Sequence, residues 1–431
     1  MIDTIKNRFQ LIQARNGGSA LTSLEQEAFQ SFLRFGIPTV KDEEWKYTRV
    51  GAAFNKNYSL ADSSSSADEL QQELGKIELP GTATANVLVL VNGRFHAGLS
   101  NIKDDNLELI SFASLADHQH SLLQHVGNSR KYVTDGLQAL NSSFLRDGLL
   151  IKVRSGQVVN EPLYIYHLSD GRTENILSQP RLLILAGANS QLSVVETYSS
   201  MGSNESFTNE IIEIVLERDA IVNYYKLQND HSQAHHVGTT HFRQLGKSVA
   251  NSVTISLKGG LVRNNLSISL EAERSEANLY GLYFIDKSTH VDNHTVVDHM
   301  KPHCESNELY KGVINDNGSA VFNGKIFVQP HAQKTNAFQS NKNVLLSENA
   351  TVNTKPQLEI FADDVKCSHG CTVGQLDEES LFYLQSRGIP ADTAKALLVQ
   401  AFSLDVLEKI KLEPFRNYVQ DLLAYSLDKR D

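Results

Sequence analysis

Two stretches of similar design decide the fold: ERDAIVNYYKL, residues 217–227, and GKSVANSVTISL, residues 246–257. Each begins with a small polar turn, continues with an alanine and ends in a strand where Val, Ile, Thr and Tyr alternate with polar residues. The unit recurs roughly every 30 residues with one longer gap, and a recurrence of this kind is the mark of a solenoid. Its alanines are Ala188, Ala220, Ala250, Ala277, Ala320 and Ala350.

The repeats lie in a long strand-rich region, from about residue 149 to residue 373. Short strands joined by corners of small residues are typical of a β-helix, and a large antiparallel sandwich with accidental spacing is the alternative. We predict a mainly β protein with a parallel β-helix core over residues 149–374. Because a solenoid has two open ends that need covering, the helical segments on either side are the natural caps.

The segments before the core are predicted to be largely helical. Residues 5–14 and 23–35 carry apolar side chains at helical spacing. We assign residues 1–80 to an N-terminal helical domain and residues 81–148 to a mixed α/β lead-in. Within the first domain, ADSSSSADE, residues 61–69, is polar and low in complexity and is predicted to be a surface loop.

The C-terminal domain, residues 375–431, is predicted to form three short helices. Asp377, followed by two glutamates, begins the first helix. The second begins near Asp392, and Pro414 separates it from the third. These helices could pack on the end of the solenoid or present an apolar stripe to a partner, and packing is the commoner use.

Composition excludes several classes of protein. The 431 residues carry a net charge of −10, without the cluster of Lys and Arg that binds a nucleic-acid backbone. The N-terminus lacks the apolar run of a secretory signal, and no run is long enough to cross a bilayer. We therefore expect a cytoplasmic protein that binds neither nucleic acid nor membrane. Cys304, Cys367 and Cys371 should be free thiols.

Residues able to do chemistry are densest in KPQLEIFADDVKCSHGCTVGQLDEE, residues 355–379. In an extended chain Cys367 and His369 point the same way, about 7 Å apart at the backbone. Gly370 would allow a sharp bend that folds Cys371 back towards them. Sulfur and imidazole suit zinc, Fe(II) or an iron–sulfur fragment, although the C-x-H-x-C spacing is shorter than in standard zinc sites. The alternative is a buried Cys367 and a hydrogen-bonded His369 at a strand end.

Other histidines are weaker candidates for metal ligands. His290 and His294 are four residues apart, as are His299 and His303. Their Thr- and Val-rich surroundings predict a strand, in which that spacing is about 13 Å and too wide for one metal. We expect the histidines of the polar stretch after residue 230 to be solvated; they are His231, His235, His236 and His241.

Two enzymatic functions are disfavoured by the sequence. Asp363 and Asp364 face opposite sides of a strand, so the acid–base pair of a β-helix polysaccharide enzyme would need Asp292, Asp298 or Asp316 as well. Such enzymes are usually secreted, and the chain has no secretory signal. No Gly-rich phosphate-binding loop occurs, so the chain itself should not be an ATPase.

Three stretches resemble one known family. TKPQLEIFADDVKCSHGCTVGQLDEESLFYLQSRGI, residues 354–389, resembles the signature of the SufB/SufD family of the SUF iron–sulfur cluster assembly machinery. SAVFNGKIFVQPHAQKTNAFQSNKNVLLSENA, residues 319–350, resembles the core of the same family. KDEEWKYT, residues 41–48, resembles the segment typical of the SufD branch, and the length of the chain also favours that branch over SufB.

The resemblance implies a non-catalytic scaffold subunit. It implies a right-handed parallel β-helix between helical domains, pairing with SufB through the β-helices, and docking of the SufC ATPase on residues 375–431. Sulfur would come from SufS and SufE or an equivalent pair. No stably bound cofactor is expected, only a transient iron–sulfur cluster in the complex. A reduced flavin is associated with such complexes, although the sequence holds no flavin fingerprint. The isolated chain could also form a homodimer.

The resemblance also assigns site residues. The family's functional histidine, in the CSHG motif, matches His369, and the motif cysteine matches Cys367. This histidine is expected at the SufB interface, where it works with a SufB cysteine at the nascent cluster and could be a transient metal ligand. Many members carry Ala in place of Cys371, which is either an extra thiol ligand or, as we favour, a passive substitution. The alternative function is a stand-alone metal-binding β-helix protein that uses Cys367, His369 and Cys371.

Overall fold

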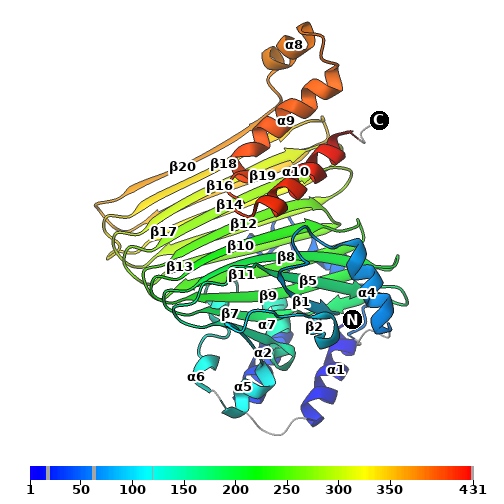
Figure 1. Ribbon diagram of the computed structural model, residues 1–431, viewed down its shortest axis with the longest axis vertical. Coiled ribbons are helices and arrows are strands. Elements are labelled where there is room, and N and C mark those ends of the chain that lie inside the picture. Colours follow the sequence, from blue (N-terminus) through cyan, green and yellow to red (C-terminus); the bar gives the residue numbers. More distant parts are fainter. Residues whose placement is uncertain (16–19, 61–64, 119, 429–431) are drawn as a thin grey trace.

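The computed structural model describes residues 1–15, 20–60, 65–118 and 120–428. Two ten-stranded sheets face each other. Sheet A has the order β19-β17-β15-β13-β11-β9-β7-β4-β3 with β6 beside β9, and sheet B has the order β2-β1-β5-β8-β10-β12-β14-β16-β18-β20. From β7 onwards consecutive strands alternate between the sheets and pair in parallel, so the chain winds as a parallel β-helix (Figure 1). The predicted fold class is confirmed.

The elements have the following bounds. The strands are β1 (Asn86–Val91), β2 (Arg94–Phe95), β3 (Leu107–Ser111), β4 (Leu149–Val153), β5 (Leu163–Asp170), β6 (Ile176–Ser178), β7 (Arg181–Ala186), β8 (Gln191–Met201), β9 (Ser206–Leu216), β10 (Ile221–Asn229), β11 (Ala234–Gln244), β12 (Val249–Lys258), β13 (Leu261–Leu270), β14 (Glu276–Ile285), β15 (His290–His299), β16 (Glu305–Ile314), β17 (Ser319–Val328), β18 (Asn336–Leu345), β19 (Thr351–Ile360) and β20 (Lys366–Gly374). The helices are α1 (Ile2–Arg15), α2 (Ala20–Phe35), α3 (Val50–Phe54), α4 (Ala67–Lys76), α5 (Phe112–His118), α6 (His120–Leu123), α7 (Gly136–Ser142), α8 (Glu378–Ser386), α9 (Ala391–Leu407) and α10 (Glu413–Asp428), with short 3-10 turns η1 (Glu43–Trp45), η2 (Ala97–Leu99), η3 (Asn128–Lys131) and η4 (Leu145–Asp147).

The repeating alanines mark two series of strands rather than one. Ala250 and Ala277 lie directly opposite each other in sheet B, whereas Ala320 lies in sheet A. All three are fully buried and occupy the second position of their strands. The polar turns before the strands contain residues in the left-handed region, such as Asp219 and Asp316, a conformation that Asp tolerates better than most residues. Each coil therefore carries two strands of similar design, one in each sheet. The repeat seen in the sequence counts strands of both sheets as one series.

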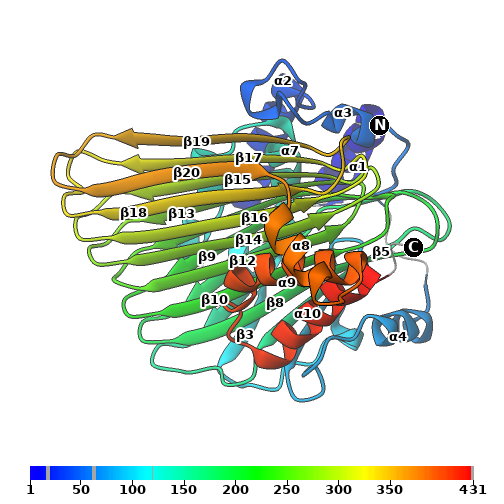
Figure 2. The ribbon, with the colours of Figure 1, turned by 90° about the horizontal axis from the view of Figure 1, so that it is seen from above.

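Both faces of the solenoid wall are buried along most of its length. Inward-pointing side chains from the two sheets form one continuous apolar core. α1, α2, α3 and α7 pack against the outer face of sheet A, and α4, α9 and α10 pack against the outer face of sheet B (Figure 2). All eleven residues of β9 are buried for this reason. Two covered faces explain why several strands are apolar without interruption.

The C-terminal helices begin where the sequence predicts, but they do not cap the solenoid. Asp377 is the N-cap of α8, and Pro414 lies in the first turn of α10. Val406 and Phe415 belong to an apolar cluster with Leu282 and other outward-pointing side chains of sheet B. The predicted packing on the solenoid end is wrong, because these helices lie along the outer face, and α8 projects away from the strands (Figure 1). The end formed by β19 and β20 stays open.

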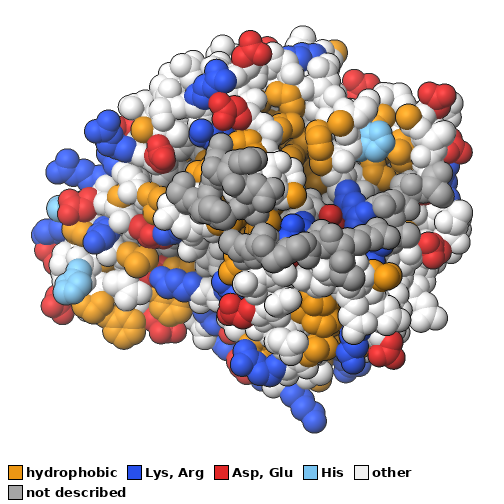
Figure 3. Space-filling model, turned by 90° about the horizontal axis from the view of Figure 1, so that it is seen from below, with side chains coloured by type: hydrophobic (Ala, Val, Ile, Leu, Met, Phe, Trp, Pro, Cys, Tyr) orange, Lys and Arg blue, Asp and Glu red, His pale blue; other side chains and the backbone are white. Residues whose placement is uncertain are grey.

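The predicted mixed α/β lead-in, residues 81–148, contains both strands and helices, and it contributes to the first coils. β1 already pairs in parallel with β5, so residues 81–148 contribute a strand to sheet B. The antiparallel strands β2 and β3 end the two sheets at this side. A space-filling view of this end shows hydrophobic side chains broken up by charged and other polar ones (Figure 3). None of the helices in the described part of the chain combines the length and apolar character needed to span a membrane.

The predicted loop at residues 61–69 is wrong in its second half. Residues 61–64 lie outside the described residues. Ser66 is the N-cap of α4, and its side chain and that of Glu69 form a reciprocal capping box. A helix therefore begins inside the stretch that low complexity alone assigned to a loop.

Candidate functional site

The CSHG stretch lies in β20, the last strand of sheet B. The pairing of β20 with β18 places three couples of residues directly opposite each other: Cys367 and Ala337, His369 and Gln339, Cys371 and Asn341. The β18 members are at most 3% exposed and face the interior. Because parallel strands keep their side chains in register, the three β20 residues continue the inner wall of the solenoid by one more strand.

This last part of the inner wall is open to solvent. No described strand pairs with the outer edge of β20. Cys367 is half-buried against the core, whereas His369 and Cys371 are exposed. A groove of about 880 Å³ next to the site is lined by His369, Phe338 and Lys409, among others. The imidazole therefore lies at the surface, within reach of another chain.

The predicted bend at Gly370 is wrong. β20 runs through Gly370 without interruption, so Cys371 does not fold back. Cys367 and Cys371 are four strand residues apart, about 13 Å at the backbone, too far for two metal–sulfur bonds of about 2.3 Å. Among the described residues, no group able to hold a metal ion includes either cysteine. A single chain does not assemble the donor set of the stand-alone metal-binding alternative.

The groups behind His369 form a polar column inside the solenoid. Glu308, Gln339 and His369 occupy matching positions on β16, β18 and β20. The side-chain amide of Gln339 donates to Glu308 Oε2 at 2.8 Å. Burial raises the pKa of Glu308 to about 7. Burial also raises the pKa of the Cys367 thiol, so this sulfur is protonated at neutral pH and is not an activated nucleophile on its own.

KDEEWKYT, residues 41–48, crosses the outer face of sheet A, and we call it the N-terminal strap. The Trp45 ring lies 3.9 Å from the guanidinium of Arg263 on β13, and its Nε1 donates to Asp135 at 3.2 Å. Two glutamates of the strap continue the contacts: Glu44 pairs with His294 and Lys325, on β15 and β17, and Glu43 pairs with Lys355 on β19. The hydrogen bond with His294 lowers the pKa of Glu44 to about 2. The strap ties the last four strands of sheet A together.

The other histidines considered as metal ligands lie in different surroundings from those predicted or are bonded to protein groups. The predicted strand over His290 and His294 is confirmed as β15, where His290 Nε2 lies 2.9 Å from the Thr48 hydroxyl. The predicted solvation of His236 and His241 is wrong, because both lie on β11, which is covered on both of its faces. His241 Nδ1 lies 2.8 Å from the Ser267 hydroxyl. Burial lowers the pKa of His236 well below its usual value, so its ring is neutral.

The carboxylates considered for a polysaccharide enzyme are occupied separately. Asp292 pairs with Arg263, Asp298 with Lys131, and Asp364 with Lys334. The structure does not join them into an acid–base pair.

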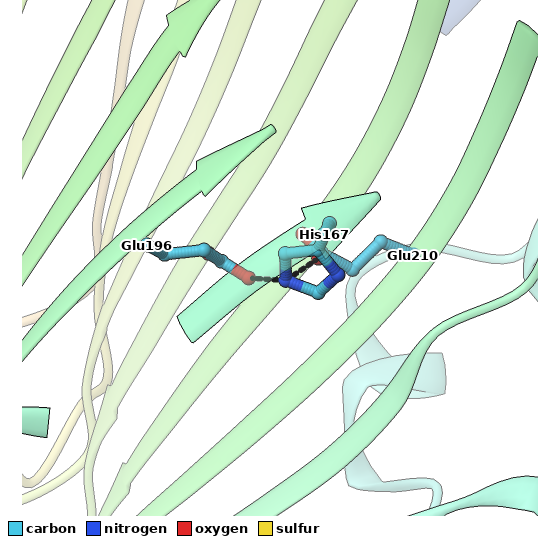
Figure 4. Close-up of side chains that lie close together, drawn as sticks. All are labelled: His167, Glu196 and Glu210. Atoms are coloured by element: carbon cyan, nitrogen blue, oxygen red, sulfur yellow. Dashed lines mark hydrogen bonds and ion pairs between the residues drawn. The ribbon is translucent and has the colours of Figure 1, made fainter. Parts of the chain in front are cut away.

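A second cluster of ionisable side chains lies inside the solenoid, and the sequence analysis missed it. His167 Nε2 lies 2.6 Å from Glu196 Oε1 and 3.4 Å from Glu210 Oε1 (Figure 4). The Lys226 ammonium lies 2.6 Å from Glu210 Oε2 and 3.4 Å from Glu196 Oε2. All four side chains are buried. Burial raises the pKa of Glu210 to about 7, whereas Lys226 and His167 overcome the effect of burial and lower the pKa of Glu196.

The cluster was missed because its members come from four different strands. His167 lies on β5, Glu196 on β8, Glu210 on β9 and Lys226 on β10. One signal was present in the sequence: each residue lies next to apolar inward positions of its own strand, as Lys226 follows Val222 and Tyr224 in IVNYYKL. A charged side chain at such a position needs a buried partner.

Comparison with known proteins gives a consistent result. The family model described as "SUF system FeS cluster assembly, SufBD core domain" matches residues 168–402, and that described as "SufBD protein N-terminal region" matches residues 2–165. The iron–sulfur cluster assembly protein SufD of Escherichia coli is 32% identical over 414 residues, 93% of this chain and 92% of that protein. An iron–sulfur cluster assembly SufBD family protein of Synechocystis is 31% identical over 94% of this chain and 91% of its own length. The chloroplastic protein ABCI7 of Arabidopsis thaliana is 27% identical, over 94% and 86%.

Proposed function

Because the chain belongs to the SufBD family of the SUF iron–sulfur cluster assembly system, we propose that it is a scaffold subunit without catalytic activity of its own. It pairs with SufB through the open end of its β-helix and carries the SufC ATPase on its C-terminal helices. The open end is the observation that carries this proposal, because it presents His369 beside two strand edges that no other described strand covers.

The open end has the properties of a surface that another β-helix would continue. β19 and β20 are the last strands of their sheets, and each leaves one row of backbone N–H and C=O groups without a neighbouring strand. Ile360, Phe361 and Val373 expose large apolar side chains there. Polar strand edges beside exposed apolar groups favour edge-to-edge pairing with a similar solenoid.

The C-terminal helices offer a separate surface for the ATPase. α9 is anchored to the solenoid, since Lys311 of β16 donates to the backbone carbonyl of Phe402 at 2.7 Å. α8 has no buried residue, and Phe382 is 72% exposed in its middle. Exposed aromatic side chains on a projecting helix are typical anchors of a protein interface. Movement of the bound ATPase would reach the solenoid through α9.

His369 would act at the interface between the two β-helices. It stands on the inner wall of the last strand, so a partner that extends the solenoid would enclose it. There the imidazole would be a ligand or proton carrier for the nascent iron–sulfur cluster, which is cargo built at the interface, together with a SufB cysteine and beside Cys367. The SufS–SufE sulfur donor and the reduced flavin belong to the assembled complex and stay predictions.

The variant His369→Ala tests this function. It should fold normally and co-purify with tagged SufB and SufC, because His369 is exposed and has no packing role in the chain. Cluster assembly by the purified complex, followed by its absorbance and iron content, should fall at least tenfold.

His331→Ala is the matched control, because this histidine is also exposed and lies in the turn after β17. The control should assemble clusters at the normal rate. Normal assembly by His369→Ala would remove His369 from the mechanism, and failure of the wild-type chain to co-purify with SufB would remove the scaffold proposal itself.

A further inference from the structure

We propose that His167, Glu196 and Glu210 bind a single divalent transition-metal ion inside the solenoid. One ring nitrogen of the histidine and one carboxylate oxygen of each glutamate all lie within 4.8 Å of one another. The site is separate from the open end and from His369, and it does not depend on the proposed scaffold role.

The distances fit a common metal ion. With bonds of about 2.1 Å, ligand atoms at right or tetrahedral angles around a metal lie about 3.0–3.4 Å apart. His167 Nε2 is 2.6 Å from Glu196 Oε1 and 3.4 Å from Glu210 Oε1, so small shifts bring the three atoms to that spacing. One imidazole nitrogen with two carboxylate oxygens suits Zn²⁺, Mn²⁺ or Fe²⁺ rather than Ca²⁺ or Cu⁺.

The outer carboxylate oxygens are already held in place. Glu210 Oε2 accepts the Tyr198 hydroxyl at 2.8 Å and Lys226 Nζ at 2.6 Å. Glu196 Oε2 accepts the Tyr224 hydroxyl. These contacts turn both Oε1 atoms towards His167, in the way that second hydrogen bonds orient the ligands of protein metal sites. The Lys226 ammonium contacts both carboxylates on their Oε2 side, at 2.6 Å from Glu210 and 3.4 Å from Glu196, and leaves the Oε1 atoms facing His167.

His236 is an independent sign of a missing ligand. It is buried, and neither of its ring nitrogens has a hydrogen-bond partner among the described residues. Its Nε2 lies 4.0 Å from Glu210 Oε2, and Glu210 Oε1 also lacks a hydrogen-bond partner. A Cβ at Gly238 would lie 2.5 Å from His236 Nε2 and 3.3 Å from Glu210 Oε2, so only glycine leaves space between them. His236 stands beside the three-residue group, on the Oε2 side of Glu210, where a bound ion would give this unpartnered imidazole a polar neighbour.

A small cavity lies between His236 and the corner that joins the two sheets. A cavity of about 20 Å³ lies beside His236 and Tyr198, enough for one water molecule or ion. Its lining continues to Asp230 and Lys258, at the ends of β10 and β12. The cavity therefore connects the unpartnered imidazole with the turn region of the solenoid.

Equilibrium dialysis of the full chain against Co²⁺ and Zn²⁺ tests the site. We expect one ion per chain and, for Co²⁺, visible absorption bands of a site with nitrogen and oxygen ligands. Glu210→Gln keeps the size of the side chain but removes a charged ligand, and His167→Ala removes the imidazole. Each should weaken binding at least tenfold.

Two control variants separate this site from others. Glu308→Gln changes another glutamate buried in the solenoid interior, whose hydrogen-bond partner is the Gln339 amide rather than a histidine. This variant should bind the metal ion normally. The double variant Cys367→Ser with Cys371→Ser should also bind normally, because the proposed ion does not use the open end.

Anomalous diffraction at the zinc edge locates the ion without relying on any variant. A peak between His167 and the two glutamates supports the proposal, and a peak elsewhere or no peak overturns it. Unchanged binding by both Glu210→Gln and His167→Ala, or an absence of binding by the wild-type chain, would show that the cluster is an internal charge network only.

Discussion

Glu308 shows how one buried carboxyl makes stability depend on pH. It lies inside the solenoid with Gln339 as its hydrogen-bond donor, and burial raises its pKa from 4.5 to about 7. Between these two values the folded state holds a proton that the unfolded state has released. The free energy of unfolding must therefore fall as the pH rises from about 4.5 to about 7 and stay lower above that range.

Glu308→Gln should remove this contribution, because an amide of the same shape carries no charge at any pH. At pH 8 the variant should be more stable than the wild-type chain by on the order of 3 kcal/mol, and at pH 4 the two should be equal. Urea unfolding at several pH values measures the difference. Glu305→Gln, at an exposed position of the same strand, should leave the pH profile unchanged. A Glu308→Gln profile that parallels the wild-type one would contradict the assignment.

At the level of single residues, alternation along a strand was the reliable guide. It correctly predicts that Cys367 and His369 share a face, because strand geometry fixes that face whatever the neighbours are. Gly370 was misread because glycine permits a bend without requiring one. The cluster around His167 could not be predicted, because strand register decides which distant side chains meet, and register is invisible in the sequence.

Among the elements, the N-terminal strap has the clearest structural role. Trp45 is almost completely buried between Arg263 and Asp135, although it lies in a short 3-10 turn at the surface of sheet A. Through Glu43 and Glu44 the same few residues reach β15, β17 and β19. Exposed ion pairs add little stability, so the buried ring is the main anchor.

Trp45→Ala should destabilise the protein by about 3–5 kcal/mol, because it leaves a cavity and removes the partner of Asp135. The midpoint of denaturant unfolding, read by circular dichroism, measures this loss. Tyr47→Ala is the matched control, since this neighbouring aromatic residue is 46% exposed and should cost less than about 1 kcal/mol. Equal losses for the two variants would show that the strap is not anchored by its tryptophan.

Element boundaries were predictable where capping residues mark them, and element positions were not. Asp377 and Pro414 gave the starts of α8 and α10. The Ser66-x-x-Glu69 pattern that begins α4 was also present, but the run of serines before it dominated the interpretation. An apolar helix face shows that the helix packs against something. It does not tell a solenoid end from a sheet face, and for this reason α9 and α10 were placed wrongly.

For the whole molecule, the repeat was enough to predict a solenoid, since a coil cannot bury its core without neighbours. The repeat could not show that each coil has two strands of similar design, because Ala250 and Ala320 have the same surroundings in the sequence but lie in different sheets. The repeat alone suggested helical caps at both ends, and only the family resemblance indicated that the coil carrying His369 would be open to another subunit. Exposure of the open end makes self-association the main expectation for the isolated chain.

Val373→Lys should reduce that self-association. Val373 is 50% exposed on the inner face of β20, so a charge there opposes the approach of a second strand edge. Size-exclusion chromatography with light scattering should show a dimer for the wild-type chain at high concentration and a monomer for the variant. Val158→Lys changes a valine with similar exposure, 46%, before β5 and should leave the dimer intact. A dimer that survives Val373→Lys would place self-association elsewhere.

The strap also sets an order of events while the chain is being made on the ribosome. Glu43 is translated 312 residues before its partner Lys355. At about 5–20 residues per second, the interval is on the order of 15–60 s. Trp45 is anchored earlier, because its partners Asp135 and Arg263 are made before Lys355, whereas the ion pair of Glu43 forms only when the final coil has left the exit tunnel.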